Sequence, residues 1–225
     1  MANMTLDSET AHVGVSTFSI FSIIYSLVNV RRAQFQSARR YGSSMLIRSL
    51  VTSLLLMSAT AFAEIEKFAI PGEKGMAFHW WPKLAPVAGW TQDKDFSFKY
   101  SINALAPIGA SFADSETVMY AKAIYKPRVP DLKSLAALIE NDKKDFVMNV
   151  PGVMIQEAKA LVTADGKSAV SLIYAPRSKG NWERVSYFEE GDFYLIFTVS
   201  SRTENGFLAT IKAYEKLLSQ YKEKP

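Results

Sequence analysis

The sequence contains no cysteine and only two histidines, His12 and His79. Without cysteine the chain can form no disulfide, no thiolate metal site and no cysteine nucleophile. A structural zinc site takes about four ligands, usually Cys or His, so two histidines are too few to build one. The sequence also lacks a G-x-S-x-G nucleophile turn and a glycine-rich phosphate loop. We therefore expect no bound metal and no cofactor.

The chain carries little net charge outside its N-terminal region. Its formal charge is +4 over 225 residues, but residues 1–63 hold five basic and two acidic residues, which leaves 21 basic and 20 acidic residues in 64–225. A nucleic-acid-binding domain favours a clustered basic surface, so we expect no nucleic-acid partner. The hydrophobic fraction of 48% and charged fraction of 21% are ordinary for a globular protein.

Residues 45–63 have the three-part pattern of a signal peptide. Arg48 supplies the positive start, residues 50–57 are a short apolar run, and Ala61-Phe62-Ala63 fits the cleavage site. The apolar run is short for a membrane span. The pattern predicts cleavage between Ala63 and Glu64, which would leave a periplasmic or secreted mature protein.

Residues 1–44 precede this signal and allow two interpretations. Residues 13–30 carry no charge and are followed by Arg31 and Arg32, as in a membrane anchor with a basic cytoplasmic flank. Alternatively, Met45 is the true start and residues 1–44 are an upstream extension. A complete signal peptide with its own Met seldom lies inside another leader, so we favour the second interpretation. Contact with a membrane is expected only if residues 13–30 are retained as an anchor.

Residues 64–225 are expected to form a single α+β domain. In its last third, residues 155–164, 168–175, 182–189 and 193–200 are predicted strands, and Asp165-Gly166 and Gly191-Asp192 are turn signals. Residues 205–221 form a predicted helix, because their apolar residues recur at the spacing that places them on one helical face. These residues are Phe207, Leu208, Ile211, Tyr214, Leu218 and Tyr221. Connections of hairpin length predict a largely antiparallel sheet with helices packed on it.

The earlier part of the domain adds three strands and a second amphipathic helix. Residues 64–70 are a short edge strand in this prediction, residues 96–104 alternate apolar and polar side chains, and residues 117–125 are apolar on both faces apart from Lys122. Asp131 is the predicted N-cap of the helix that follows. The charged residues 140–145 are expected to be its solvated end.

This order of elements resembles the PsbP-like fold, which occurs in the extrinsic PsbP subunit of photosystem II and in bacterial envelope proteins of the DcrB type. Residues 131–146, the turn at Asp165-Gly166 and residues 193–221 carry the resemblance, which covers roughly residues 90–222. The resemblance implies an adaptor or binding module and supplies no catalytic residue.

The candidate binding residues are His79, Trp80, Trp81 and Trp90, which lie in an aromatic stretch interrupted by Pro82 and Pro86. Buried aromatic anchors can contribute about 2 kcal/mol or more each to an interface, whereas exposed charge pairs contribute about 0–1 kcal/mol. The alternative is that these side chains close one end of the core. Asp93 and Asp95, and the acidic turn around Gly191, are interpreted as solvated turn charges.

The functional expectation is a non-enzymatic exported envelope protein that binds another envelope protein or a small apolar ligand. The alternative is a hydrolase-type enzyme in which His79 acts with a carboxylate brought near it by the fold.

Overall fold

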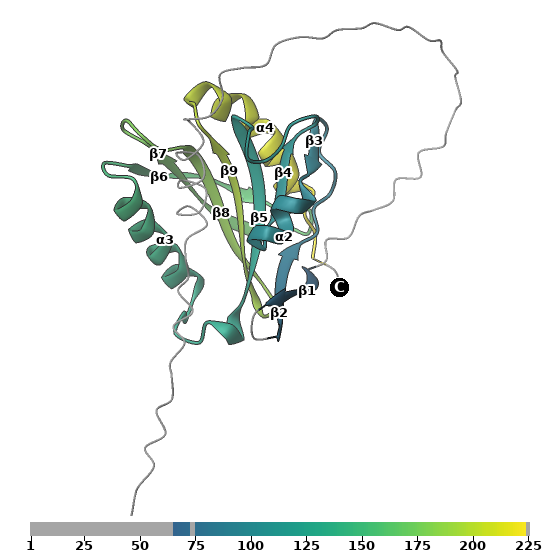
Figure 1. Ribbon diagram of the computed structural model, residues 1–225. Coiled ribbons are helices and arrows are strands. Elements are labelled where there is room, and N and C mark those ends of the chain that lie inside the picture. The colour runs from purple at the N-terminus through teal and green to yellow at the C-terminus, as the bar shows by residue number, and fades with distance from the viewer. Residues whose placement is uncertain (1–64, 73–74, 224–225) are drawn as a thin grey trace, which may run out of the picture.

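The computed structural model describes residues 65–72 and 75–223 (Figure 1). The strands are β1 (Ile65–Gly72), β2 (Gly75–Pro82), β3 (Trp90–Gln92), β4 (Asn103–Pro107), β5 (Thr117–Tyr125), β6 (Met154–Val162), β7 (Ser168–Ala175), β8 (Trp182–Glu190) and β9 (Phe193–Ser201). The helices are α2 (Lys94–Tyr100), the 3-10 turn η2 (Lys126–Arg128), α3 (Leu135–Asn149) and α4 (Glu204–Ser219). The predicted signal peptide, the stretch 13–30 and the cleavage site at Glu64 lie outside the described residues.

Seven of the strands form one sheet in the order β3-β4-β5-β9-β8-β7-β6, and neighbouring strands pair antiparallel. The two predicted tight turns join β6 to β7 and β8 to β9, with Gly166 at φ 85° and Gly191 at φ 50°. Glycine adopts positive φ without steric penalty, which explains these two positions. The predicted α+β class with a largely antiparallel sheet is confirmed, and β5 lies inside the sheet as its apolar sequence indicated.

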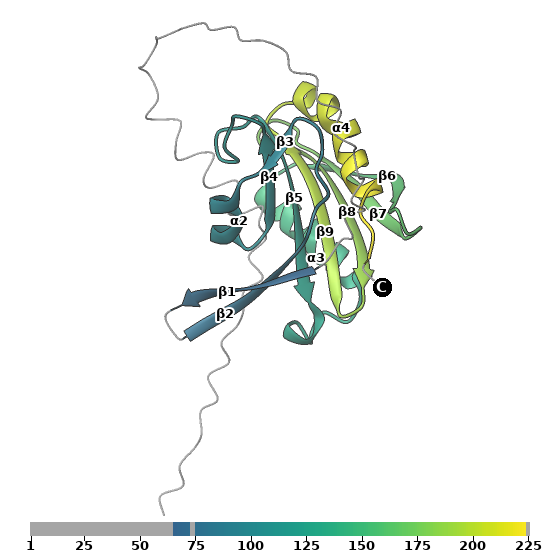
Figure 2. The ribbon, with the colours of Figure 1, turned by 90° about the vertical axis from the view of Figure 1, so that its right-hand side faces the viewer.

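Helices cover both faces of this sheet. Leu195 and Phe197 of β9 pack in one apolar cluster with α4, whereas the alternate residues Tyr194 and Ile196 pack in another with α3. Helix α2 lies on the α3 side, and α2 and α4 are on opposite sides of the sheet in Figure 2. Among the described residues, none of the helices has the length and apolar character needed to cross a membrane.

The predicted apolar face of α4 is right except at one residue. Phe207, Tyr214 and Leu218 are buried, but Leu208 is 60% exposed. At about 100° per residue, Leu208 lies on the opposite side of the helix from Leu217, nine residues later, and Leu217 is only 1% exposed. Tyr221 is buried after the helix has ended.

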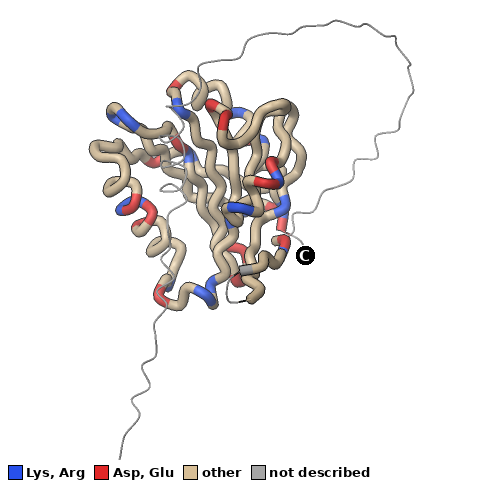
Figure 3. The backbone as a smooth tube through the Cα atoms, viewed as in Figure 1, with Lys and Arg blue, Asp and Glu red and all other residues tan. Residues whose placement is uncertain are grey.

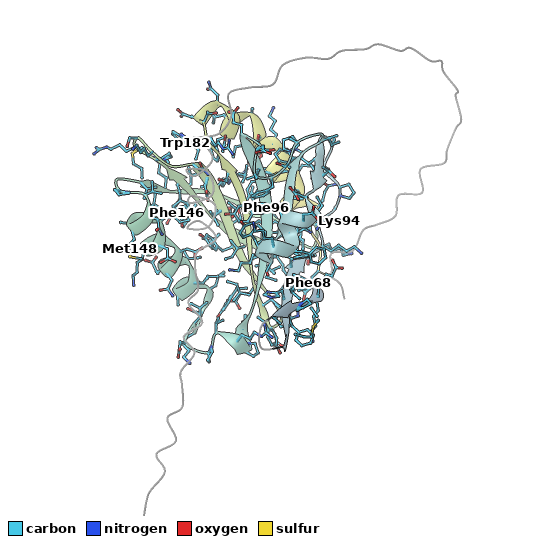
Figure 4. All side chains as sticks on the ribbon, in the orientation of Figure 1. Phe68, Lys94, Phe96, Phe146, Met148 and Trp182 are labelled. Carbon is cyan, nitrogen blue, oxygen red and sulfur yellow. The ribbon has the colours of Figure 1, made fainter. Side chains whose placement is uncertain are left out.

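Helix α3 begins later and ends later than predicted. Its N-cap is Ser134, whose hydroxyl accepts from the Ala137 N–H, so the assignment of Asp131 as N-cap is wrong. The charged residues 140–145 lie within the helix, which continues to Asn149. Phe146 points toward the sheet and Met148 away from it (Figure 4), in keeping with exposures of 4% and 70%. The helix therefore turns one side of its charged stretch toward the sheet.

The predicted strand at residues 96–104 is wrong, because this stretch contains α2 and the start of β4. Asp93 decides the local fold. One carboxylate oxygen accepts from the Phe96 N–H at 3.0 Å, which caps α2, and the other accepts from the Phe112 N–H at 2.9 Å. Phe96 and Tyr100 are one helical turn apart and their ring centroids are 4.3 Å apart. The apolar residues of this stretch fit both the two-residue alternation of a strand and the four-residue spacing of a helix. The Asp93 cap stabilises the helix and so decides between the two. Asp93 is thus a cap and not a solvated turn charge.

Candidate functional site

The hairpin of β1 and β2, which we call the arm, forms its own two-stranded sheet and extends away from the seven-stranded sheet (Figure 2). Lys67 lies opposite Trp80, and Phe68 lies opposite His79. Because paired residues share a face and neighbours alternate, Trp80 lies on one face of the arm while His79 and Trp81 lie on the other. The predicted site residues are therefore divided between two surfaces.

The Trp80 face combines aromatic rings with cations. The Trp80 ring is 5.0 Å from Tyr125 and 6.0 Å from Phe193, which joins the base of the arm to the main sheet. The Arg128 guanidinium lies 4.5 Å from the Trp80 ring centroid, and the Lys67 ammonium lies 4.4 Å from that of Phe78. Arg128 also donates to the Phe78 carbonyl. Such cation–π contacts contribute about 0.5–1 kcal/mol each at exposed sites.

The His79 face is a second aromatic row. Phe68 lies 3.7 Å from Trp81, 5.6 Å from His79 and 5.5 Å from Phe98 of α2, measured between ring centroids. The Trp81 indole N–H donates to the Glu66 carboxylate at 3.2 Å. Burial, and then the nearby Arg128 charge, lower the pKa of His79 below its usual value. Among the described residues, no hydrogen bond joins His79 to a carboxylate.

Large apolar side chains of the arm remain in solvent. Met76 is 56% exposed and Phe78 39% exposed, and Phe98 beside the arm is 46% exposed. Trp80 is half-buried, whereas Trp81 is only 3% exposed. The alternative interpretation, that these aromatic residues close the core, therefore holds in part, since Trp81 is buried and Trp80 packs against the core cluster beneath α4.

Trp90 does not belong to the arm. It is half-buried in β3, the edge strand of the main sheet, where it pairs with Pro107 and packs on the core cluster beneath α4. Sequence proximity grouped Trp90 with Trp80 and Trp81, but the intervening loop carries it to a different sheet. The structure thus gives the arm three of the four predicted residues.

A second group of polar and titratable side chains lies between α3 and the central strands. We call it the α3-side cluster and define it as Tyr120, Lys122, Asp142, Tyr174, Glu183, Tyr187, Thr198 and Ser200. The strand register explains this group. Lys122 lies opposite Ile196, which lies opposite Tyr187, and Tyr120 lies opposite Thr198. Seven of the eight side chains come from the same face of the sheet, and Asp142 reaches it from α3.

Asp142 lies near two tyrosines that contact each other across this interface. The hydroxyl oxygens of Tyr174 and Tyr187 are 3.1 Å apart, and Tyr187 is close enough to Asp142 to affect its pKa. Burial raises the pKa of Asp142 to about 6, against the opposing effects of Lys122 and Tyr187. Burial also raises the pKa of both tyrosines. Asp142 can therefore exchange a proton close to neutral pH.

Glu183 is an almost fully buried carboxyl group, 1% exposed. Its Oε1 accepts from the Ser200 hydroxyl at 2.8 Å, while its Oε2 has no hydrogen-bond partner among the described residues. Burial raises the pKa of Glu183 to about 8, with Ser200 opposing the shift. The group is thus mostly protonated and uncharged at neutral pH.

Lys122 is half-buried at the centre of the sheet. Burial lowers its pKa, and the nearby Asp142 charge partly offsets this effect. Sequence reasoning missed the cluster because its members are far apart in the chain. One signal was available, since Lys122 is the single charged residue in the otherwise apolar β5.

The other charged groups of the described residues form no comparable cluster. Within residues 65–72 and 75–223, no three His, Asp or Glu side chains are grouped so as to hold a metal ion. Basic and acidic residues are interspersed over the described fold in Figure 3, without a dominant region of one sign in that view. At the acidic turn around Gly191, Glu189 pairs with Lys126, and Glu190 accepts from the Tyr221 hydroxyl. These contacts hold the turn in place.

Comparison with known proteins adds little to this description. No family model and no curated protein matches the chain. A protein of unknown function from Pseudomonas aeruginosa is similar with a TM-score of 0.42 and 12% identity, covering 71% of this chain and 98% of its own. The Ran-binding protein Mog1p of Saccharomyces cerevisiae has a TM-score of 0.37 and 7% identity, covering 70% of this chain and 90% of its own. At these TM-scores neither likeness carries a functional argument, and the resemblance to PsbP and DcrB proteins stays a prediction.

Proposed function

We propose that the mature chain is an exported, non-enzymatic protein of the cell envelope that binds a protein partner through the arm. The observation that carries this proposal is the exposure of Met76 and Phe78 on a hairpin that extends from the body of the fold. Exposed apolar side chains gathered in one place are typical of interaction sites. Export itself rests on the signal-peptide pattern of residues 45–63.

The partner class follows from the two faces of the arm. Met76 and Phe78 are exposed on one face, and Phe98 is exposed beside the other. A flat bilayer surface could cover only one of these faces, whereas a protein groove can enclose both. Burying apolar area contributes roughly 25 cal/mol per Å², so enclosure on both sides favours a protein partner. Lys67 beside Phe78 favours a partner that places a carboxylate there.

The hydrolase alternative has weaker support. His79 stacks on Phe68 and forms no hydrogen bond to a carboxylate among the described residues. A general base needs a partner or substrate within hydrogen-bond reach and a neighbouring group to orient it. The aromatic surroundings of His79 fit a contact surface better than a proton-transfer site.

The experiment places a photo-crosslinking amino acid at Phe78 and, as a matched control, at Leu208, which is 60% exposed on α4. Crosslinks formed in intact envelopes should contain one defined protein when the probe is at residue 78 and not when it is at residue 208. Met76→Ala and Phe78→Ala should weaken recovery of that protein by about tenfold or more each, as expected for interface anchors. Leu208→Ala should leave recovery unchanged.

Melting temperatures separate binding from folding. The two arm substitutions should each change the free energy of unfolding by no more than about 0.5 kcal/mol, as ordinary surface substitutions do. The melting temperature should therefore stay close to that of the wild type. Equal crosslinking from residues 78 and 208 would contradict the proposal, as would crosslinks to lipid alone. Loss of recovery accompanied by loss of folding would make these residues structural.

A further inference from the structure

Lys122 differs from the other lysines of the described chain. Four described lysines are half-buried: Lys122, Lys126, Lys143 and Lys167. The last three each form a salt bridge, with Glu189, Glu140 and Glu223 respectively. Lys122 forms none within the described residues, although it lies in the middle of the sheet. A half-buried amine without an ion pair is costly to keep charged, so its position calls for an explanation.

We propose that Lys122 is a covalent capture site for a small aldehyde or ketone, which it binds reversibly as an imine, with Asp142 transferring the protons. This site is separate from the arm and does not depend on the function proposed for it. The class of ligand follows from the chemistry. A primary amine beside an acid can condense with a carbonyl group, and lysines in partly desolvated sites serve this role.

The geometry supplies the groups that the reaction needs. Lys122 lies two residues from Tyr120 on the same face of β5, and across β9 from Tyr187. Asp142 enters from α3 and lies close enough to Lys122 and Tyr187 for both to lower its pKa. The other titratable groups that act on Asp142 or Tyr120 are Glu183 of β8, Asp145 of α3 and Tyr214 of α4.

The protonation states favour the same reaction. Burial lowers the pKa of Lys122, which increases the share of neutral, nucleophilic amine at neutral pH. Burial raises the pKa of Asp142 to about 6, so both its acid and base forms are present near neutrality. A proton donor whose pKa lies near the working pH is the most effective.

The steps balance without any oxidant or reductant. The Lys122 nitrogen lone pair adds to the carbonyl carbon, and the carbonyl oxygen takes a proton from Asp142. The nitrogen then loses a proton to the Asp142 carboxylate. Asp142 returns this proton to the hydroxyl group, which leaves as water while the C=N bond forms. The nitrogen of the resulting protonated imine then gives its remaining proton to the Asp142 carboxylate. The products are one imine and one water, Asp142 ends protonated as it began, and hydrolysis reverses the sequence.

The test uses propionaldehyde as the probe, with cyanoborohydride to reduce any imine to a stable amine that peptide mass spectrometry can locate. With the aldehyde limiting and at about pH 7, Lys122 should be modified at least tenfold faster than the exposed Lys133. This difference should shrink above about pH 9, because ordinary lysines then also become neutral amines. Lys122→Arg should lose the fast reaction and leave the rate at Lys133 unchanged. Lys126→Arg, at a half-buried but ion-paired lysine, should leave the rate at Lys122 unchanged.

Asp142→Asn tests the proton carrier, and Glu140→Gln on the same helix is its matched control. Asp142→Asn should slow modification of Lys122 by at least about tenfold while the chain stays folded. Glu140→Gln should leave the rate unchanged. If Asp142→Asn unfolds the protein, the comparison of Lys122 with Lys133 in the wild-type chain still decides. Modification of Lys122 no faster than Lys133, or an unchanged rate in folded Asp142→Asn, would overturn the proposal.

Discussion

At the scale of single residues, the buried carboxyl of Glu183 makes stability depend on pH. In the folded protein Glu183 keeps its proton up to about pH 8, whereas its ordinary pKa is 4.5. Between these values the unfolded chain binds fewer protons than the folded one, so the free energy of unfolding falls as pH rises. Asp142, with a pKa of about 6 against 3.8, acts in the same direction at lower pH.

Glu183→Gln should remove the Glu183 part of this dependence. Glutamine is an uncharged group of nearly the same shape and can still accept from Ser200. Wild type should lose about 2–4 kcal/mol more than the variant between about pH 5 and about pH 8. Urea unfolding at several pH values measures this difference. Parallel curves for the two proteins would mean that Glu183 is ionised in the fold.

At the scale of elements, the short helix α2 depends on a single side chain. Asp93 accepts from backbone N–H groups of both Phe96 and Phe112, so it joins the helix to the loop after β4. A cap residue stabilises by about 0.5–2 kcal/mol, and the second bond adds to this.

Asp93→Ala should therefore lower the free energy of unfolding by about 2 kcal/mol, because two N–H groups lose their acceptor. Asp93→Asn keeps one acceptor oxygen and should cost about half as much. Denaturant unfolding at neutral pH gives both values. Equal and small effects of the two substitutions would show that the cap contributes little.

Helix α4 provides a matched pair of leucines, one buried and one exposed. Leu218 is 0% exposed and belongs to the main core cluster, whereas Leu208 is 60% exposed. Leu218→Ala should lower the free energy of unfolding by about 2–5 kcal/mol through loss of packing and a residual cavity. Leu208→Ala should change it by no more than about 0.5 kcal/mol. Similar losses at both positions would contradict the assigned helix face.

At the scale of the whole molecule, the arm and the α3-side cluster lie on different parts of the fold. The arm is a separate two-stranded sheet held at its base by Trp80 against Tyr125 and Phe193. The cluster lies between α3 and the central strands. The substitutions proposed for the two sites share no contact, so their effects should be independent.

The signal-peptide prediction concerns the chain as it is made. Mass spectrometry of protein taken from native envelopes should find Glu64 as the first residue, because Ala61 and Ala63 supply the small side chains of a cleavage site. Ala63→Arg should block cleavage and leave a longer, membrane-associated form. Peptides from residues 1–44 in the mature protein would contradict this prediction.

The sequence by itself determined the elements whose signals are local. The hairpins at Gly166 and Gly191 follow from glycine at positive φ between strands, and β5 and α4 follow from apolar spacing along the chain. Local signals failed where two patterns competed. Residues 96–104 satisfied a strand pattern, and the capping bonds of Asp93 made the first part a helix.

Tertiary structure alone decided the composition of both sites. Trp80, Trp81 and Trp90 are close in sequence, but strand alternation and a loop place them on three different surfaces. Lys122, Asp142 and Tyr187 are far apart in sequence, and the pairing of β5, β9 and β8 under α3 brings them together. Side-chain pKa values and exposure depend on such neighbours in space, so no pattern along the chain could have supplied them.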